Sequence, residues 1–387
     1  MRIRKMTMMS TGRGRRKQFY RDLPDLTVSR AECGEVLRVS TMTARIAPGI
    51  TMRADAFRVL YRSTDLAGNP ITVSGAILIP RQSSGSVPLV GFAPGTQGMS
   101  RSASVSQLLE KGLEYEGVFI ALALARGWAV AVTDYPGLGT QGTHPYVIGS
   151  TNGRAVLDVM RAARFLLGTR STQVSRYGIY GYSEGGNAAA WAAQLNASYA
   201  PDLPLAGVAV GAPPADLVEM GKSLDRTAGV FLLMYSAMGL AASFDDLDLE
   251  RCLNTAGKSL MPFVRRLHPL LLAAAGFILP KSRTFYLSTD PFEDPAWIER
   301  MREASLGYLP PAAPVLVGHG ERDRVVAYRQ TELLTQRWRE LGVEISRHRI
   351  RLGGHFTSAP RFARAGFAFL ADRFAEADRK PSSELAS

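Results

Sequence analysis

Cysteine is scarce in this sequence, which has only Cys33 and Cys252 among 387 residues. Two cysteines cannot build the framework of several disulfides that stabilises small secreted domains. A single bridge between them stays open, because nothing in the sequence brings the two positions together.

Long apolar runs are also absent. The longest run near the middle, residues 267–280, is shorter than the roughly 20 apolar residues that span a bilayer, and it contains His268 and Pro269. Glycines follow the strand-like residues 88–92, but they form neither of the common phosphate-binding patterns. Membrane-spanning and nucleotide-binding proteins are therefore disfavoured, and a hydrophobic content of 46% suits one large domain with an insertion.

Acidic residues are missing from the first 18 positions, which contain seven lysines and arginines. This arm supplies +7 of the net charge of +12, so 12 − 7 = +5 remains for the rest of the chain. We expect a solvated, disordered arm; contact with nucleic acid or anionic lipid is the alternative. No apolar signal-peptide core follows the arm. The chain as written therefore predicts a cytoplasmic protein, or a secreted one if the true start differs.

The most informative motif is Gly181-Tyr182-Ser183-Glu184-Gly185, which has the pattern G-x-S-x-G. Strand-forming residues 176–180 precede it, and the helix-forming residues 186–195 follow it. This context is typical of a nucleophile elbow, in which a sharp turn lifts the serine hydroxyl clear of the sheet. Glycines beside the turn let strand and helix pack closely. We therefore predict that Ser183 is a nucleophile; the alternative is an ordinary glycine-rich turn.

The partners of a serine in such an elbow follow it in the chain, first the acid and then the histidine. Among five histidines, His355 has the best context, because it follows the strand-like residues 344–351 and a Gly-Gly pair and precedes a helix. The acid is expected after the strand-like residues 314–318. Asp323 fits better there than Glu321, which we expect to be solvated or paired with an arginine. The predicted triad is Ser183, His355 as general base and Asp323.

An oxyanion hole requires two backbone N–H groups. One is expected from Glu184, directly after the serine. The other is expected from the loop at residues 93–98, where Thr96 or Gln97 is the candidate donor. The alternative for this loop is a plain turn.

Strand and helix patterns alternate along most of the chain, which indicates a mostly parallel sheet. The alternation breaks from about 213 to 311, where the pattern is helical or irregular. We therefore predict an α/β-hydrolase fold with helices on both faces of the sheet and a mainly helical cap insertion. The expected elements are an antiparallel hairpin (56–63 and 71–79), helices at 106–125 and 151–168, and strands at 128–133 and 205–210. The expected units are 1–40 (basic disordered arm and N-terminal extension), 41–212 (core), 213–311 (cap), 312–376 (core) and 377–387 (disordered tail).

The expected cap is rich in Leu, Met, Phe and Ala. Above a serine site such a cap indicates a pocket for an apolar acyl or alcohol group; the alternative is a helical bundle packed only for stability. We expect substrate contacts from Tyr135, Tyr182, Phe231 and Tyr235.

Several short segments together resemble the secretory lipase family, the lipase A-like α/β-hydrolases, over roughly residues 30–375. The resemblance implies hydrolysis of carboxylic esters, including acylglycerols, by a triad at Ser183, Asp323 and His355, without a cofactor. Where members often have Cys-Ala-Pro-Ser, this chain reads Ser102-Ala103-Ser104-Val105, so a disulfide there is absent. The matching segments are residues 60–64, 94–98, 112–116, 133–139, 153–158 and 181–186.

The predicted function is therefore that of a serine hydrolase, a lipase or carboxylesterase, that acts through an acyl-enzyme on Ser183. An acyltransferase with the same acyl-enzyme is the main alternative. An oligopeptidase-like serine peptidase and a non-catalytic binding protein are weaker ones. We expect a small-molecule or lipid ester as substrate, transient contact with a lipid surface, and no cofactor, metal or nucleic acid. The oligomeric state is not determined by the sequence.

Overall fold

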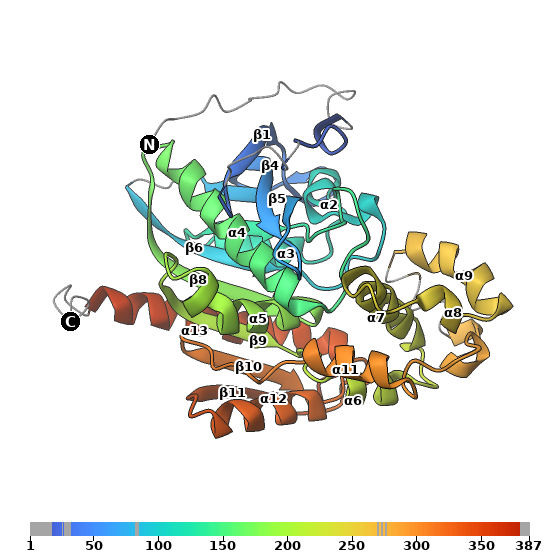
Figure 1. Cartoon of the computed structure of the whole chain (residues 1–387). Coiled ribbons are helices and arrows are strands. Elements are labelled where there is room, and N and C mark those ends of the chain that lie inside the picture. Colours follow the sequence, from blue (N-terminus) through green and yellow to red (C-terminus); the bar gives the residue numbers. More distant parts are fainter. Residues whose placement is uncertain are drawn as a thin grey trace.

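The computed structural model describes residues 18–24, 26, 32–81, 85–268, 271, 274 and 277–379. Residues 1–17 of the predicted arm and residues 380–387 of the predicted tail lie outside these ranges. Within them, nine strands form one continuous sheet (Figure 1). Their spatial order is β1 (Val36–Met42), β4 (Ala54–Thr64), β5 (Pro70–Pro80), β7 (Ala129–Thr133), β6 (Ser86–Ala93), β8 (Gln173–Tyr182), β9 (Leu205–Gly211), β10 (Val315–Gly320) and β11 (Ile345–Ile350).

The direction of neighbouring strands differs between the two parts of the sheet. From β7 to β11 all neighbouring strands are parallel, whereas β1, β4 and β5 are antiparallel to their neighbours. The predicted hairpin is confirmed as β4 and β5, which pair from Ala54–Pro80 to Thr64–Pro70. A small second sheet joins β2 (Arg45–Ala47) and β3 (Ile50–Thr51). The predicted mostly parallel α/β fold is confirmed.

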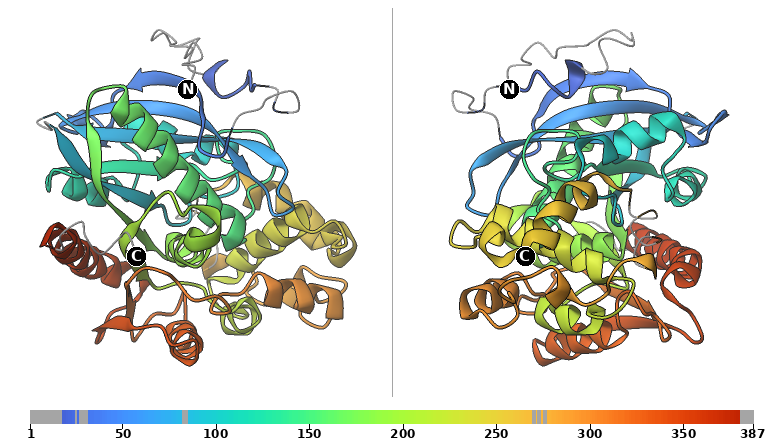
Figure 2. Two further views of the ribbon diagram at one scale, coloured as in Figure 1. Left: turned by 60° about the vertical axis from the view of Figure 1, so that its left-hand side comes forward. Right: turned by 90° about the vertical axis from the view of Figure 1, so that its right-hand side faces the viewer.

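Helices cover both faces of the sheet (Figure 2). One core joins the sheet to α4 (Gly149–Gly168), α5 (Glu184–Tyr199) and α12 (Arg329–Glu340). The other core joins it to α2 (Val105–Lys111), α3 (Gly117–Leu124) and α13 (His355–Arg379). Adjacent strand residues face opposite cores, as Leu89 and Val90 do. Strands buried on both faces have to be apolar throughout, which explains why every residue of β7 is buried.

Residues before 41 contribute to the fold, so the prediction of an arm and extension ending at residue 40 was wrong for part of this range. The edge strand β1 begins at Val36 and pairs with β4. Phe19 is 1% exposed and clusters with Tyr20 and Leu60, and the Tyr20 hydroxyl lies 2.9 Å from Ser106 Oγ. Burial of these two aromatic rings offsets the entropy cost of ordering the chain here. At the other end, α13 extends to Arg379, beyond the predicted start of the tail at 377.

The single helix predicted over residues 106–125 is two helices. α2 ends at Gly112, whose φ of 72° lies in the left-handed region that favours glycine as a helix cap. α3 begins five residues later, at Gly117. The short connection at residues 113–116 lies against the candidate site described below.

The segment between β9 and β10 is helical. In Figure 1 its helices gather beside one end of the sheet, around their own apolar core. Tyr146, Val147 and Ile148, which precede α4, belong to the same core and join the segment to the rest of the fold. No helix among the described residues is long and apolar enough to cross a membrane. The described helices of the segment are α6 (Leu217–Leu224), α7 (Val230–Ser243), α8 (Leu249–Cys252), α9 (Thr255–Arg266), η2 (Arg283–Phe285) and α11 (Pro295–Glu303).

Candidate active site

The predicted strand–turn–helix around Ser183 is present. β8 ends at Tyr182 and α5 begins at Glu184, with Ser183 between them at φ 60° and ψ −123°. A positive φ in a non-glycine residue costs on the order of 1–3 kcal/mol and is found mainly at functional sites. The N–H of Ser183 donates to the carbonyl of Gly211 at the end of β9, at 2.9 Å. The sheet therefore holds this strained turn in place.

The glycines around the turn are required by close packing. A Cβ on Gly181 would collide with the carbonyl oxygen of Gly185, and one on Gly185 would collide with that of Ala93. A Cβ on Gly186 would meet the carbonyl oxygen of Gly211. The start of α5 can lie this close to three strand ends only because these side chains are absent.

Three strand ends bring Ser183, His355 and Asp323 together. The carboxyl ends of the parallel strands β8, β10 and β11 lie at one edge of the sheet, and each of these residues follows one of them. His355 Nε2 lies 3.0 Å from Ser183 Oγ, and His355 Nδ1 lies 2.6 Å from Asp323 Oδ2. A proton on Nδ1 satisfies the carboxylate and leaves the Nε2 lone pair to accept the serine hydroxyl. This is the geometry of a nucleophile, a base and an orienting acid.

Four hydrogen bonds surround the carboxylate of Asp323. Its Oδ1 accepts the N–H groups of Val325 and Val326 at 2.8 and 2.9 Å. Its Oδ2 accepts from His355, and His319 Nε2 lies 3.2 Å away. Burial alone would raise the pKa of Asp323, but hydrogen bonds from His319 and His355 and the positive charge they can hold outweigh burial, so the pKa lies below its usual range. The carboxylate therefore stays charged in a largely buried position.

The alternative acid, Glu321, points elsewhere. It forms an ion pair with Arg349, whose side chain is exposed. This matches the expectation that Glu321 would pair with an arginine. Of the two candidate acids, Asp323 is the one whose carboxylate contacts His355.

His355 is held at the start of α13. The hydroxyl of Tyr182 donates to the backbone carbonyl of His355 at 2.7 Å, so the residue before the serine also positions the histidine. The first glycine of the Gly-Gly pair before His355 is required by close packing, because a Cβ on Gly353 would collide with Ser358 Oγ.

The loop with the second expected oxyanion donor lies beside the elbow. Ala93 at the end of β6 pairs with Gly181 at the end of β8, so the two loops leave the sheet side by side. Among the described residues, neither the Thr96 nor the Gln97 N–H donates a hydrogen bond. The Glu184 N–H lies in the first turn of α5, where helix amides have no intrahelical acceptor. All three predicted donors are therefore available to a bound oxyanion.

The four aromatic residues predicted to contact substrate are buried. The Tyr135 hydroxyl donates to the Pro94 carbonyl at 2.9 Å, and that of Tyr182 is bound to His355. Phe231 and Tyr235 lie in α7 within the core of the helical segment. Their contact with substrate stays a prediction.

The helical segment contains a small apolar cavity of about 50 Å³. Side chains of α6, α7 and α9 line it, among them Met220, Leu233, Met234 and Met261, and Tyr286 closes one side. Polar atoms contribute almost nothing to its walls. An apolar group is therefore the kind of ligand that this space accepts.

The family model described as "Secretory lipase" matches residues 103–381, well over half of the chain. The chain belongs to the secretory lipase family. Among relatives, a probable inactive lipase of Mycobacterium tuberculosis is 28% identical, over 92% of this chain and 81% of that one. A trichothecene C-3 esterase of Fusarium sporotrichioides is also 28% identical, over 89% and 80%. Lipase A of Candida antarctica in its closed state has the same fold, with a TM-score of 0.80 at 18% identity over 91% and 84%.

Membership of the secretory lipases confirms the predicted class of activity: the chain is a carboxylic ester hydrolase with the α/β-hydrolase fold. Its substrate is thus a small-molecule ester of the lipid type. The resemblance to this family, which short sequence motifs indicated, is confirmed as well.

One contact of this secretory lipase that the sequence did not reveal involves Glu184, the residue after the serine. His144 Nε2 is 2.7 Å from Glu184 Oε1, and both side chains are buried. His144 Nδ1 lies 3.1 Å from the carbonyl of Pro136, which can only accept, so Nδ1 carries a proton. The short Nε2–Oε1 contact then needs a second proton. The pair is therefore imidazolium with carboxylate, or imidazole with carboxylic acid, and is neutral overall. No local pattern indicates this contact, because 40 residues separate its partners.

A second missed residue is His319, which contacts the same oxygen of Asp323, Oδ2, as His355 does. Its Nδ1 lies 2.7 Å from Thr331 Oγ1, and its Nε2 lies 2.9 Å from the carbonyl of Val326. A signal was available, because His319 lies at the end of the strand-like run that introduces the acid, four residues before Asp323.

Proposed function

We propose that this secretory lipase hydrolyses carboxylic esters through an acyl-enzyme on Ser183. The observation that supports it most is His355, whose two ring nitrogens bridge Ser183 Oγ and Asp323 Oδ2. As Ser183 Oγ attacks the ester carbonyl, His355 Nε2 takes the hydroxyl proton, and Asp323 stabilises the imidazolium. The same proton passes to the leaving alkoxide, which departs as an alcohol. A water molecule then attacks the acyl-enzyme with His355 again as base, and the acid leaves.

The negative charge that develops on the carbonyl oxygen would be met by backbone N–H groups. We assign these to Glu184 and to Thr96 or Gln97, whose amides have no other acceptor among the described residues. Preformed donors of this kind typically contribute 10²–10³ in kcat each. The N-terminal end of α5 adds a favourable dipole at the same place.

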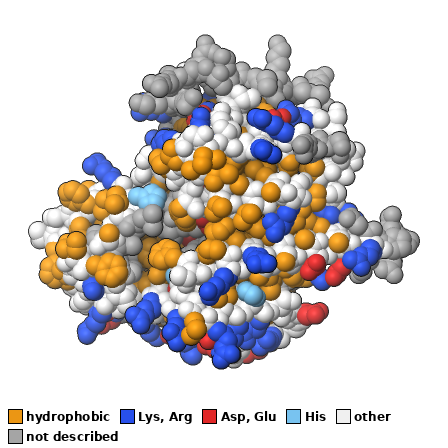
Figure 3. All heavy atoms as spheres, turned by 180° about the vertical axis from the view of Figure 1, so that it is seen from behind, with side chains coloured by type: hydrophobic (Ala, Val, Ile, Leu, Met, Phe, Trp, Pro, Cys, Tyr) orange, Lys and Arg blue, Asp and Glu red, His pale blue; other side chains and the backbone are white. Residues whose placement is uncertain are grey.

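The proposed substrates have an apolar acyl or alcohol group. We propose that residues 213–311 act as a cap over the site, as their apolar core and cavity suggest. Exposed apolar side chains, such as Phe263 at 65% and Phe277 at 74%, suit transient contact with a lipid surface. Hydrophobic side chains also gather across the face seen in Figure 3, interspersed with Lys and Arg. The family description favours secretion over the cytoplasmic location expected from the sequence.

A panel of p-nitrophenyl esters of increasing acyl length tests this function. The wild-type chain should hydrolyse them, and Ser183→Ala should reduce kcat by at least about 10³. A fluorophosphonate should phosphonylate Ser183 with loss of fluoride, which adds the mass of the reagent less HF to the peptide that contains Ser183. Ester hydrolysis that survives in Ser183→Ala would refute the proposal. Leu233→Trp, which fills part of the cavity, should reduce activity on long-chain esters more than on acetate.

A further inference from the structure

Residues of the connection between α2 and α3 form hydrogen bonds to three successive residues of the candidate oxyanion loop, Gly95, Thr96 and Gln97. These hydrogen bonds involve a backbone N–H, a backbone carbonyl and a side-chain amide of the loop. A connection of four residues thus fixes a loop that has no regular secondary structure. The bonds are Gly95 N–H to Glu116 Oε2 at 2.6 Å, Tyr115 O–H to the Thr96 carbonyl at 3.1 Å, and Gln97 Nε2–H to Glu114 Oε1 at 3.2 Å.

The bond from Tyr115 fixes the orientation of one peptide plane. The carbonyl of Thr96 and the N–H of Gln97 belong to the same planar trans peptide, so they point in opposite directions. Holding the Thr96 oxygen toward the Tyr115 hydroxyl therefore turns the Gln97 N–H away from Tyr115. We propose that Tyr115 and Glu116 are positioning residues of the oxyanion hole, and that the Gln97 N–H is its second donor. This inference rests on the proposed function.

Glu116 anchors the loop at the residue before Thr96. Its carboxyl occupies the Gly95 N–H, so this amide is not free to bind substrate. Burial raises the pKa of Glu116 well above its usual range, and the neighbouring Glu114 raises it further. A neutral carboxyl still accepts the Gly95 N–H through its carbonyl oxygen.

The packing leaves little freedom for this arrangement to shift. A Cβ on Gly95 would lie 2.7 Å from the Tyr115 hydroxyl and 3.4 Å from the carbonyl of Tyr182. The loop is therefore enclosed between Tyr115 and the elbow. From another side, Thr96 Oγ1 lies 2.9 Å from the hydroxyl of the buried Tyr146.

Tyr115→Phe tests the role of a single hydroxyl. Phe keeps the ring in place and removes one hydrogen bond, so the unfolding temperature should fall by no more than about 4 °C. We expect kcat for a p-nitrophenyl ester to fall about tenfold, less than the loss of a whole oxyanion donor, while KM changes less than twofold. Inhibition by a boronic acid, which mimics the tetrahedral intermediate, should weaken by the same factor. The matched control is Tyr308→Phe, because the exposed Tyr308 makes no hydroxyl hydrogen bond among the described residues.

Glu116→Gln and Glu116→Met test the second positioning residue. The amide oxygen of Gln can still accept the Gly95 N–H, so Glu116→Gln should keep kcat within about threefold. Met has a similar length but offers no comparable acceptor, so Glu116→Met should lower kcat at least tenfold. Equal effects of the two variants would contradict the role of the acceptor, provided that both unfold at the wild-type temperature.

The outcome separates this inference from the proposed function. If wild-type protein does not react with a fluorophosphonate at Ser183, the acyl-enzyme proposal fails. If wild type reacts and Tyr115→Phe has the same kcat and the same affinity for the boronic acid, the positioning role of Tyr115 is wrong while the acyl-enzyme stands.

Discussion

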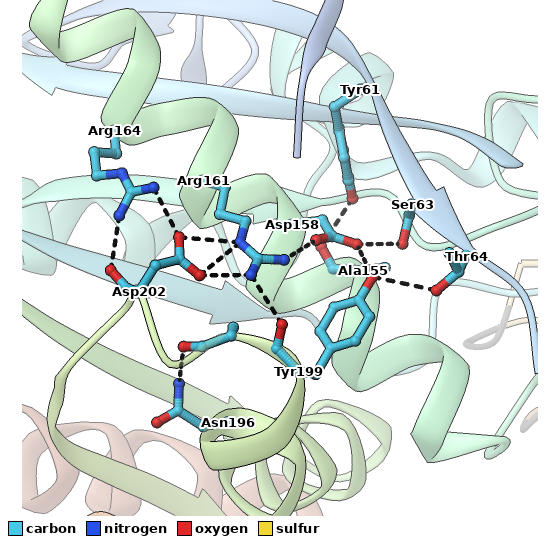
Figure 4. A network of polar contacts seen from close by, with 11 residues as sticks. Tyr61, Ser63, Thr64, Ala155, Asp158, Arg161, Arg164, Asn196, Tyr199 and Asp202 are labelled. Carbon is cyan, nitrogen blue, oxygen red and sulfur yellow. Dashed lines mark hydrogen bonds and ion pairs between the residues drawn. The ribbon is translucent and has the colours of Figure 1, made fainter. Parts of the chain in front are cut away.

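A partly buried ion-pair network joins the C-terminal end of α5 to α4 (Figure 4), and its disruption should destabilise the protein measurably. The carboxylate of Asp158 in α4 is fully buried. It accepts from Ser63 Oγ and the Tyr199 hydroxyl, each at 2.7 Å, and from Arg161 at 3.1 Å. Arg161 also pairs with Asp202 and donates to the carbonyl of Tyr199, the last residue of α5. The network therefore joins β4, α4 and α5.

Arg161→Met removes the only cation paired with Asp158 in the described network. Breaking a fully buried pair costs about 3–5 kcal/mol. Because the Arg161 side chain is 15% exposed and two hydroxyls still bind Asp158, we expect about 2–3 kcal/mol. Arg164→Met is the matched control, because the ion pair of Arg164 within the part of the chain that the structure describes is with Asp202, and both side chains are more than a third exposed. Such surface pairs contribute less than about 1 kcal/mol.

The stability lost in Arg161→Met should depend on pH. Burial raises the pKa of Asp158 to about 6, although hydrogen bonds from Tyr199, Ser63 and Arg161 lower it. In the wild type, burying the charged carboxylate of Asp158 therefore lowers the free energy of unfolding. This reduction is absent below pH ~4, where the carboxyl is protonated in both states, grows between pH ~4 and ~6, and is constant above pH ~6. Without Arg161 the pKa should rise further, so Arg161→Met should lose more stability at pH 8 than at pH 5.

Urea unfolding followed by circular dichroism at pH 5 and pH 8 gives the required midpoints. Adding Asp158→Asn to Arg161→Met should restore part of the stability at pH 8, because it removes the unpaired charge. The reasoning is refuted if Arg161→Met is no less stable than Arg164→Met, or if its loss is the same at both pH values.

The remaining predictions concern the site and its glycines. Asp323→Asn should lower kcat by about 10³–10⁴, whereas Glu321→Gln should stay within twofold; the reverse order in ester assays would reassign the acid. In a Ser183→Ala background, the stability contributed by Asp323 should be full above pH ~4 and lost as pH falls through its lowered pKa; unfolding midpoints from pH 3 to 7, with and without Asp323→Asn, would test this. Gly181→Ala should abolish activity or folding because its Cβ would meet a backbone oxygen. Gly168→Ala, at an open position at the end of α4, should change the unfolding free energy by less than about 1 kcal/mol; comparable losses in the two variants, measured by thermal unfolding, would refute the packing argument.

Local sequence patterns were informative wherever the decisive contact is between neighbours in the chain. The turn at Ser183 was predictable because strand-forming residues, glycines and a helix former stand side by side. His355 and Asp323 were found because each follows a strand-like run. Since parallel strands end at one edge of a sheet, residues after such strands meet without any knowledge of side-chain packing.

Patterns failed where burial depends on distant partners. The edge strand β1 escaped prediction because its pairing with β4 is the reason that it is a strand. Phe19 fell in the range predicted as arm and N-terminal extension, outside the core, because the apolar surface that covers it comes from the sheet. The break at Gly112 was missed because a glycine between two helix-forming segments does not reveal its φ.

The sequence by itself determined the fold class, the family, and a serine, histidine and aspartate in the right order. Only the tertiary structure decided which contacts surround these groups: the His144–Glu184 pair beside Ser183 in the chain, the contact of His319 with Asp323, and the bonds of Tyr115 and Glu116 to the candidate oxyanion loop. These contacts join residues that are 4 to 40 positions apart in the chain. Their geometry depends on how helices pack on the sheet, and no sequence period encodes that packing.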